Sequence, residues 1–211
     1  TEYCGAGIAY KLAEEILGKD HPIMKKLSCF AAIGTIGDSV EISEDNRKIV
    51  IDGLENMKYG KGSEGLKMLL EAQKFSEGST ATDVAFNIVP VLNACGRLKD
   101  DGAKMGVVAL IDGGREKREK VNELLELNDL RKKLVEEAVS RLDLYAMAVS
   151  KDRSIFVVDN QIPLGIVGIV AGKISEYTGK PAFVLAKDET TGFYKGSARS
   201  KSNDYSLAGL M

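Results

Sequence analysis

Apolar residues recur at helical spacing along the first half of the chain. Ile8, Leu12 and Ile16 are four residues apart and Gly18 follows them, which predicts an amphipathic helix over residues 4–17 with a glycine at its end. Similar spacing predicts four further helices, over residues 24–36, 45–57, 64–73 and 85–92, the last interrupted at Pro90. The first part of the chain is therefore expected to be largely helical.

The pattern becomes more polar between residues 115 and 147. Apolar residues recur there at steps of three or four among many Lys, Arg and Glu side chains, which predicts one long, highly charged helix. We expect this helix to connect two lobes, with its charges forming a solvated face that contains pairs four residues apart. Its apolar positions are Leu127, Leu130, Leu134, Ala138 and Leu142.

Strand-forming residues dominate the last third of the chain. Residues 154–158 are β-branched and aromatic, residues 165–177 have helical spacing, and residues 181–186 are again typical of a strand. A polar turn over 188–192 precedes a possible antiparallel strand over 193–200. This order predicts a small mixed α/β unit after the long helix.

The composition allows one large or two small cores, because the chain has 211 residues and is 44% hydrophobic. The longest uncharged apolar stretch, 162–172, is interrupted by Pro163 and is shorter than the roughly 20 residues of a membrane span. Charged residues near the start argue against a signal peptide, so we expect a cytoplasmic protein with no membrane partner. The net charge of −2 means that any nucleic-acid binding requires a local basic patch.

Cysteine and histidine content excludes several kinds of site. Cys4, Cys29 and Cys95 are far apart in apolar surroundings, which favours buried thiols over a disulfide framework or a zinc site. The one histidine, His21, precedes Pro22 in an expected turn. The chain therefore cannot form a histidine-rich zinc site or a Ser-His-Asp triad from its own residues.

Asp38 is the first candidate for chemistry. It follows the apolar segment 31–37 at a glycine-containing end, where a carboxylate could bind a hard cation such as Mg²⁺ or Mn²⁺. Considered alone, an aspartate in this position is also typical of an ordinary helix cap or turn.

Two later segments carry groups suited to phosphate. In residues 86–98 (FNIVPVLNACGRL), Arg97 offers a planar fork of donors and Gly96 permits close backbone approach. In residues 195–200 (KGSARS), a glycine, two hydroxyls and a guanidinium could together bind a terminal phosphate. Without further context, we would interpret these two segments as a surface or structural arginine and as a plain β-strand with polar edges.

Four blocks of sequence occur in order along the chain. They are CGAGIAYKL at 4–12, AAIGTIGDSVEISEDNRKIVIDGL at 31–54, FNIVPVLNACGRL at 86–98, and GIVGIVAGKI, GKPA and KGSARS within 165–200. Together they resemble the RecJ-type exonucleases of the DHH phosphoesterase family. The resemblance implies an α/β fold that comprises the helix-rich end of a DHH-type parallel-sheet domain, a long connecting helix and a small mixed α/β second domain. The implied ranges are 1–112 for the C-terminal part of the DHH metal-binding domain, 113–149 for the connecting helix and 150–211 for a truncated DHH-associated domain.

The resemblance also implies a function, a metal-dependent exonuclease that hydrolyses single-stranded DNA from its 5′ end in recombination and repair. Two Mn²⁺ or Mg²⁺ ions would activate water, with Asp38 as a catalytic metal ligand. The residues implied to bind nucleic acid or its phosphate are Asn93, Arg97, Gly196, Ser197, Arg199 and Ser200.

No Asp-His-His occurs in the sequence, so the remaining metal ligands are expected upstream of Thr1. We therefore predict that the chain, as a fragment, does not hydrolyse DNA. Exposed apolar faces and unpaired strand edges would favour its self-association.

The chain departs from the RecJ pattern at three positions, and two other functions stay open. Ser39-Val40 follows Asp38 where the family has a nearby proline, residues 161–164 lack the family's Trp and His, and Cys95 replaces an alanine. The DHH branch that cleaves short oligoribonucleotides or cyclic dinucleotides typically carries GGGH where this chain has GSAR. Two alternatives remain. The chain could belong to a DHH-type protein that binds single strands without catalysis, or it could be a domain with a structural role alone.

Overall fold

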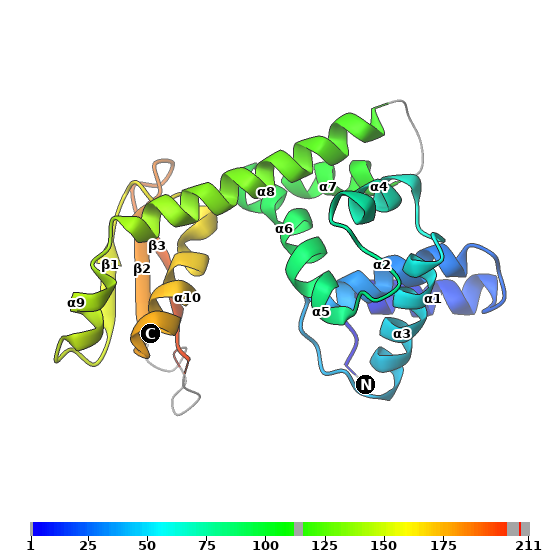
Figure 1. The fold of residues 1–211 in the computed structure, drawn as a ribbon, viewed down its shortest axis with the longest axis horizontal. Helices are drawn as coiled ribbons and strands as arrows, with labels where there is room; N and C mark the ends of the chain where they lie inside the picture. Colours follow the sequence, from blue (N-terminus) through cyan, green and yellow to red (C-terminus); the bar gives the residue numbers. More distant parts are fainter. Residues whose placement is uncertain (1, 112–115, 202–206, 208–211) are drawn as a thin grey trace. The chain divides into compact units, whose positions relative to one another are not determined.

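The computed structural model describes residues 2–111, 116–201 and 207, and the chain divides into two compact units (Figure 1). Unit 1 comprises Thr1–Cys95 and Asp101–Glu126, and unit 2 comprises Gly96–Asp100 and Leu127–Met211. The short stretch Gly96–Asp100, which contains Arg97, thus belongs to the second unit. The family-based boundaries after residues 112 and 149 stay a prediction.

The regular secondary structure of unit 1 is helical in all of its described residues. The predicted helices over 4–17, 24–36, 45–57 and 64–73 are confirmed, with ends shifted by one or two residues at most. Its elements are α1 (Gly5–Leu17), α2 (Met24–Gly37), α3 (Glu44–Lys58), α4 (Glu64–Ala72), α5 (Ala81–Asp83), the π-helix η1 (Val84–Ile88), α6 (Val89–Leu98), α7 (Gly102–Leu110) and the first part of α8 (Lys117–Ser140). The last three residues of α6 and the second part of α8 belong to unit 2.

Helix α2 lies at the centre of the first three helices because glycines let its neighbours approach closely. A Cβ added at Gly53 of α3 would overlap the Ser28 carbonyl oxygen and the Ala32 side chain of α2. A Cβ added at Gly34 of α2 would lie 2.5 Å from the Ala6 Cβ of α1. These glycines belong to sequence blocks that carry the family resemblance, so part of that resemblance reflects helix packing.

The structure corrects three expectations about helices. The helix is not broken at Pro90, because α6 continues directly from the π-helical turn η1, and a wider π-turn accommodates a proline that has no N–H to donate. The long charged helix ends at Ser140, and the Asp143 side chain caps a separate helix, α9 (Leu144–Val149). The stripe predicted on α1 is exposed, at 58% for Ile8, 59% for Leu12 and 71% for Ile16.

Unit 2 contains the predicted strand-helix-strand unit and its antiparallel addition. Strands β1 (Ile155–Val158) and β2 (Ala182–Lys187) pair in parallel, and β3 (Tyr194–Arg199) pairs antiparallel with β2. Between β1 and β2 run the 3₁₀ turn η2 (Leu164–Ile166) and helix α10 (Val167–Thr178), which packs against β2 and β3. The core of the unit forms here from buried apolar residues of α10, the sheet and the end of α8.

The GKPA block has a structural role in unit 2. Gly179 ends α10 in the left-handed region at φ 69°. The Lys180 ammonium donates to the Met147 and Ser150 carbonyl oxygens at the end of α9, at 2.8 Å each. The block therefore ends one helix and binds the C-terminus of another.

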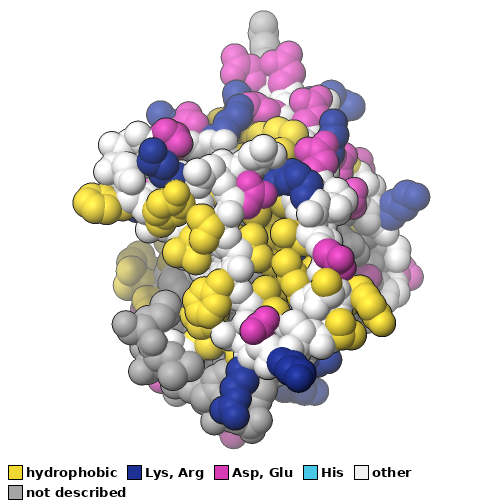
Figure 2. Space-filling view, turned by 90° about the vertical axis from the view of Figure 1, so that its left-hand side faces the viewer, with side chains coloured by type: hydrophobic (Ala, Val, Ile, Leu, Met, Phe, Trp, Pro, Cys, Tyr) yellow, Lys and Arg dark blue, Asp and Glu magenta, His cyan; other side chains and the backbone are white. Residues whose placement is uncertain are grey.

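The second face of the sheet carries apolar side chains that α10 does not cover. The rings of Phe156 and Phe183 stack with centroids 4.5 Å apart, and Phe156 is 66% exposed. They line an open hollow of about 1050 Å³, which Pro181, Leu185 and residues 196–199 also line. Figure 2 shows apolar side chains gathered in the middle of the side of the molecule that includes unit 2, with Lys and Arg near the margins.

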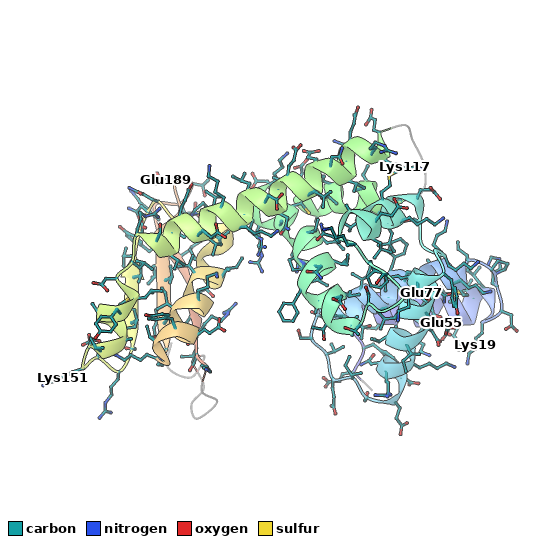
Figure 3. The ribbon with its side chains drawn as sticks, viewed as in Figure 1. Lys19, Glu55, Glu77, Lys117, Lys151 and Glu189 are labelled. Carbon is teal, nitrogen blue, oxygen red and sulfur yellow. The ribbon has the colours of Figure 1, made fainter. Side chains whose placement is uncertain are left out.

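Charged side chains lie on the outside of both units. Lys151 and Glu189 of unit 2 are exposed and lie at the edge of that unit (Figure 3). Glu55 and Glu77 of unit 1 are also exposed, and both line one hollow. Within the described residues, no helix is both long and apolar enough to cross a membrane.

Candidate functional site

In unit 2, Arg97 contacts the turn that leads into α10. Its Nη1 donates a hydrogen bond to the Gly165 carbonyl oxygen at 3.1 Å. The backbones also touch, since a Cβ added at Gly165 would overlap the Arg97 carbonyl oxygen. Position 165 thus requires glycine, because a side chain there would prevent the two backbones from approaching. This approach places the exposed Arg97 guanidinium beside the turn.

Ser197 and Arg199 lie beside the same segment from β3. A Cβ added at Gly168 would lie 3.2 Å from Ser197 Oγ and 3.3 Å from Arg199 Nη2. The two side chains are linked to each other, because Arg199 Nη1 donates to Ser197 Oγ at 2.9 Å. Residues from distant parts of the sequence, near 97, 165–168 and 197–199, are therefore neighbours in unit 2.

The electrostatic character of this cluster, which we call the Arg97–Arg199 cradle, favours an anion. It consists of Arg97, Gly165, Gly168, Ser197 and Arg199. Two guanidinium groups lie near the start of α10, a helix of 12 residues with no acidic side chain in its fully described first turn. The N-terminal end of a helix carries partial positive charge and free N–H groups, which adds to the arginine charges.

Gly196 and Ser200 take other positions. Strand alternation places Gly196 on the opposite face of the sheet from Ser197, where it pairs with Leu185. A Cβ there would overlap the Val184 carbonyl oxygen, so the glycine permits close strand pairing. Ser200 follows the last residue of β3. Their predicted part in phosphate binding stays a prediction.

In unit 1, Asp38 and Asn93 line one small hollow of about 300 Å³. Asp38 is exposed and follows the last residue of α2, and its N–H donates to the Gly34 carbonyl oxygen at 2.9 Å. Gly37 lets α6 approach, since a Cβ there would lie 3.2 Å from a methyl of Val89. The structure thus brings together these two predicted residues of unit 1.

A buried side chain that the sequence analysis did not single out fixes the segment after Asp38. Asn46 is 0% exposed, and its Nδ2 donates to the Glu2 and Glu41 carbonyl oxygens at 2.8 Å each. Ser39, directly after Asp38, has φ 54°, in the left-handed region that costs a non-glycine residue energy. Asn46 lies inside the second sequence block, at 31–54. Its place in that block was the sequence signal that could have identified it.

The described residues do not form a metal centre on their own. No group of three or more His, Cys, Asp or Glu side chains among them could hold an ion. One exposed carboxylate, Asp38, cannot supply the several oxygen ligands that Mg²⁺ or Mn²⁺ requires.

Comparison with known proteins gives one consistent result. No family model matches the chain. The chain is 34% identical to the single-stranded-DNA-specific exonuclease RecJ of Bacillus subtilis over 204 residues, which are 94% of this chain and 25% of that protein. It is 34% identical to RecJ of Thermus thermophilus over 190 residues, and 33% identical to RecJ of Escherichia coli over 190 residues. These matches cover 89% and 85% of this chain, and 27% and 32% of those proteins.

Solved structures agree with the sequence relatives. Exonuclease RecJ bound to manganese matches with a TM-score of 0.77 and 33% identity, over 98% of this chain and 51% of that one. RecJ from T. thermophilus in complex with Mn²⁺ matches with a TM-score of 0.75 and 32% identity, over 93% of this chain and 28% of that one.

Fold and sequence together show that the chain is similar to part of the proteins named as single-stranded-DNA-specific exonucleases. Within this class the chain is RecJ-like along almost all of its length. The chain spans 25%, 27% and 32% of the three curated relatives named above.

Proposed function

We propose that the Arg97–Arg199 cradle of unit 2 binds the 5′-terminal phosphate of single-stranded DNA. The observation that carries this proposal is that one short segment contacts Arg97 at Gly165 and lies beside Ser197 and Arg199 at Gly168. Two guanidinium forks, a hydroxyl and a helix N-terminus suit the several oxygens and the double charge of a terminal phosphate. The names of the RecJ relatives support single-stranded DNA as the source of that phosphate.

We further propose that the chain is part of a cytoplasmic, Mn²⁺- or Mg²⁺-dependent exonuclease that acts from the 5′ end. The relatives are named as exonucleases, and related RecJ structures hold Mn²⁺ or Mg²⁺. Asp38 would supply one carboxylate to such a centre, and further ligands would have to come from other segments. The metal would activate water and neutralise the phosphate charge, while the cradle would hold the strand end.

The phosphate proposal can be tested by replacing Arg199 with alanine. Loss of a charge-assisted hydrogen bond should weaken binding of a 5′-phosphorylated oligonucleotide by about 1–3 kcal/mol, or roughly 5- to 150-fold, at fixed salt. Fluorescence anisotropy measures the affinity, and the same strand with a 5′-hydroxyl should bind the wild-type chain and the variant alike. Lys173→Ala, which removes an exposed positive charge from α10, is the matched control. Equal losses in both variants, or no preference for the 5′-phosphate, would refute the proposal.

The metal part of the proposal has its own test. With Asp38 as a lone candidate ligand, the purified chain should release no nucleotides from a 5′-labelled single strand in Mn²⁺ or Mg²⁺. Metal-dependent release that Asp38→Asn abolishes would overturn this expectation.

We also propose that the chain self-associates through the open face of the sheet in unit 2, with a second copy as the partner. The exposed stacked rings and the apolar hollow beside them support this choice. Size-exclusion chromatography should show elution that depends on concentration, and Phe156→Lys should abolish that dependence. Leu12→Lys, on the exposed stripe of α1, is the control. A monomer at all concentrations would contradict the proposal.

A further inference from the structure

Arg131 has an unusual environment within the charged helix α8. Its Nε is buried and has no hydrogen-bond partner among the described residues. Asn128, three residues earlier and therefore on the same side of the helix, is 4% exposed, and its Oδ1 also lacks a partner there. Buried polar atoms without partners cost about 1–3 kcal/mol each, so two of them on one face suggest a ligand that would satisfy them.

Unlike Arg131, two neighbouring lysines of α8 form ion pairs with acidic residues of the same helix. Lys132 pairs with Asp129 at 3.2 Å, and Lys133 pairs with Glu137 at 3.8 Å. These pairs confirm the predicted solvated face of the helix. Arg131 lies between these residues in sequence, but its pKa is lowered, first by burial and then by the positive charge of Arg97.

A hollow in unit 2 joins this part of α8 to Arg97. Its volume is about 760 Å³, and Leu130 and Leu134, the residues on either side of Arg131 along α8, line it. Residues 96–100 and 163–165 complete the lining, so Arg97 and its hydrogen-bond partner Gly165 lie on the same hollow as α8. Asp100 is the one carboxylate on this described lining, and it is exposed to solvent.

Two guanidinium groups close enough to repel each other are stabilised when an anion lies between them. We propose that Arg131 is a second nucleic-acid contact, which binds the phosphate adjacent to the one held by the Arg97–Arg199 cradle. The hollow beside Arg97 would admit that phosphodiester, and the Asn128 amide oxygen would accept a hydrogen bond from Arg131. This inference rests on the proposed binding of single-stranded DNA and extends its site from one phosphate to two.

The test compares Arg131→Gln with Lys133→Gln in the 211-residue chain. Each variant removes one positive charge from α8, but the Lys133 side chain is 72% exposed and pairs with Glu137. Anisotropy titrations of a 5′-phosphorylated oligonucleotide over a range of salt concentrations give the slope of log Kd against log salt. Loss of one phosphate contact to a single strand lowers the magnitude of this slope by about 0.7. We expect that decrease, with a severalfold loss of affinity at low salt, for Arg131→Gln alone.

Arg131→Met keeps the apolar stem and provides a second variant if the glutamine variant unfolds. An unchanged slope in a folded Arg131 variant, or an equal decrease in Lys133→Gln, would overturn the inference. The proposed function is tested separately by Arg199→Ala. If that change weakens binding and the Arg131 changes do not, the inference about Arg131 fails while the proposed function stands.

Discussion

In unit 2, predicted phosphate-binding residues from distant parts of the sequence lie around one glycine-containing turn, whereas in unit 1 Asp38 lies exposed beside Asn93. The difference follows from the chemistry of the two ligands. A phosphate can be held by two cations, a hydroxyl and a helix N-terminus, all of which one small α/β unit provides. A pair of divalent ions needs several carboxylates or imidazoles, and the described residues place no three such groups together.

Gly165→Ala is expected to have the largest effect on stability. It would push apart the backbones of Arg97 and Gly165, which are in contact in the cradle. The added Cβ overlaps the Arg97 carbonyl oxygen, so the backbone must move. We expect a loss of about 3 kcal/mol in the free energy of unfolding, at the upper end of the usual cost of overpacking. Urea unfolding followed by circular dichroism measures it.

Gly172→Ala is the matched control for that substitution. Gly172 lies inside α10, and a Cβ there meets nothing within 4 Å. Alanine should stabilise the helix by about 0.5–1 kcal/mol through its higher propensity. A similar loss of stability in both variants would show that the contact between Arg97 and Gly165 has no special importance.

Much of the fold could be predicted from the sequence because local patterns determine it. Helical spacing predicted the first four helices, β-branched and aromatic residues predicted β1 and β2, and the polar turn over 188–192 predicted β3, with strand ends within one residue of those observed. The exposure of Ile8, Leu12 and Ile16 could not be predicted, because spacing shows that apolar residues share a face but not what covers that face. The break after Ser140 depends on the cap at Asp143, a local signal that apolar periodicity does not contain.

A smaller effect, on affinity for the 5′-phosphorylated strand, is expected from a substitution that narrows the cradle but leaves its backbone contacts in place. Gly168→Ala places a Cβ at 3.2 Å from Ser197 Oγ and 3.3 Å from Arg199 Nη2, so these side chains must move by a few tenths of an ångström. We expect severalfold weaker binding of the 5′-phosphorylated strand with little change in unfolding free energy. Gly172→Ala, one turn further along α10, should leave the affinity unchanged. Equal affinities for all three proteins would argue against a phosphate at this turn.

The candidate site was predictable where motifs carried it. Arg97, Ser197 and Arg199 came from sequence blocks, but the contacts of Arg97 with Gly165 and of Ser197 and Arg199 with Gly168 depend on tertiary packing that a single sequence does not reveal. Arg131 had no sequence signal, because it lies in a stretch of Lys, Arg and Glu whose other members are solvated pairs. Its distinguishing feature is a buried Nε without a partner, which becomes visible in the structure.

A pH effect is expected at the turn that joins β2 to β3. The Lys195 ammonium, and then the hydrogen bonds from Thr190, lower the pKa of Asp188 well below its ordinary value. The folded state therefore binds its proton less readily than the unfolded state, for which the pKa is about 3.9. The stabilisation is fully present above that value and is lost as the pH falls below it.

Asp188→Asn should therefore lower the urea midpoint of the chain near pH 6, and the difference from wild type should narrow towards pH 3. Lys195→Met removes the largest cause of the pKa shift. The urea midpoint of this variant should therefore depend on pH less strongly than the midpoint of the wild type. A constant difference between wild type and Asp188→Asn across this range would show that the ionised Asp188 carboxylate is not the source of the stabilisation.

The smallest effect is expected at Asp38, and it tests the comparison of the two units most directly. Its side chain is exposed, so Asp38→Asn should change the free energy of unfolding by less than about 0.5 kcal/mol. Removing one negative charge far from the cradle in sequence should change the affinity for single-stranded DNA by less than about twofold. Thermal unfolding of both proteins with and without Mn²⁺ provides the sharper measurement, because an ion that binds the folded state raises its midpoint. If Mn²⁺ stabilises the wild-type chain but not Asp38→Asn, unit 1 assembles a metal site from residues of this chain, and the contrast with unit 2 is lost.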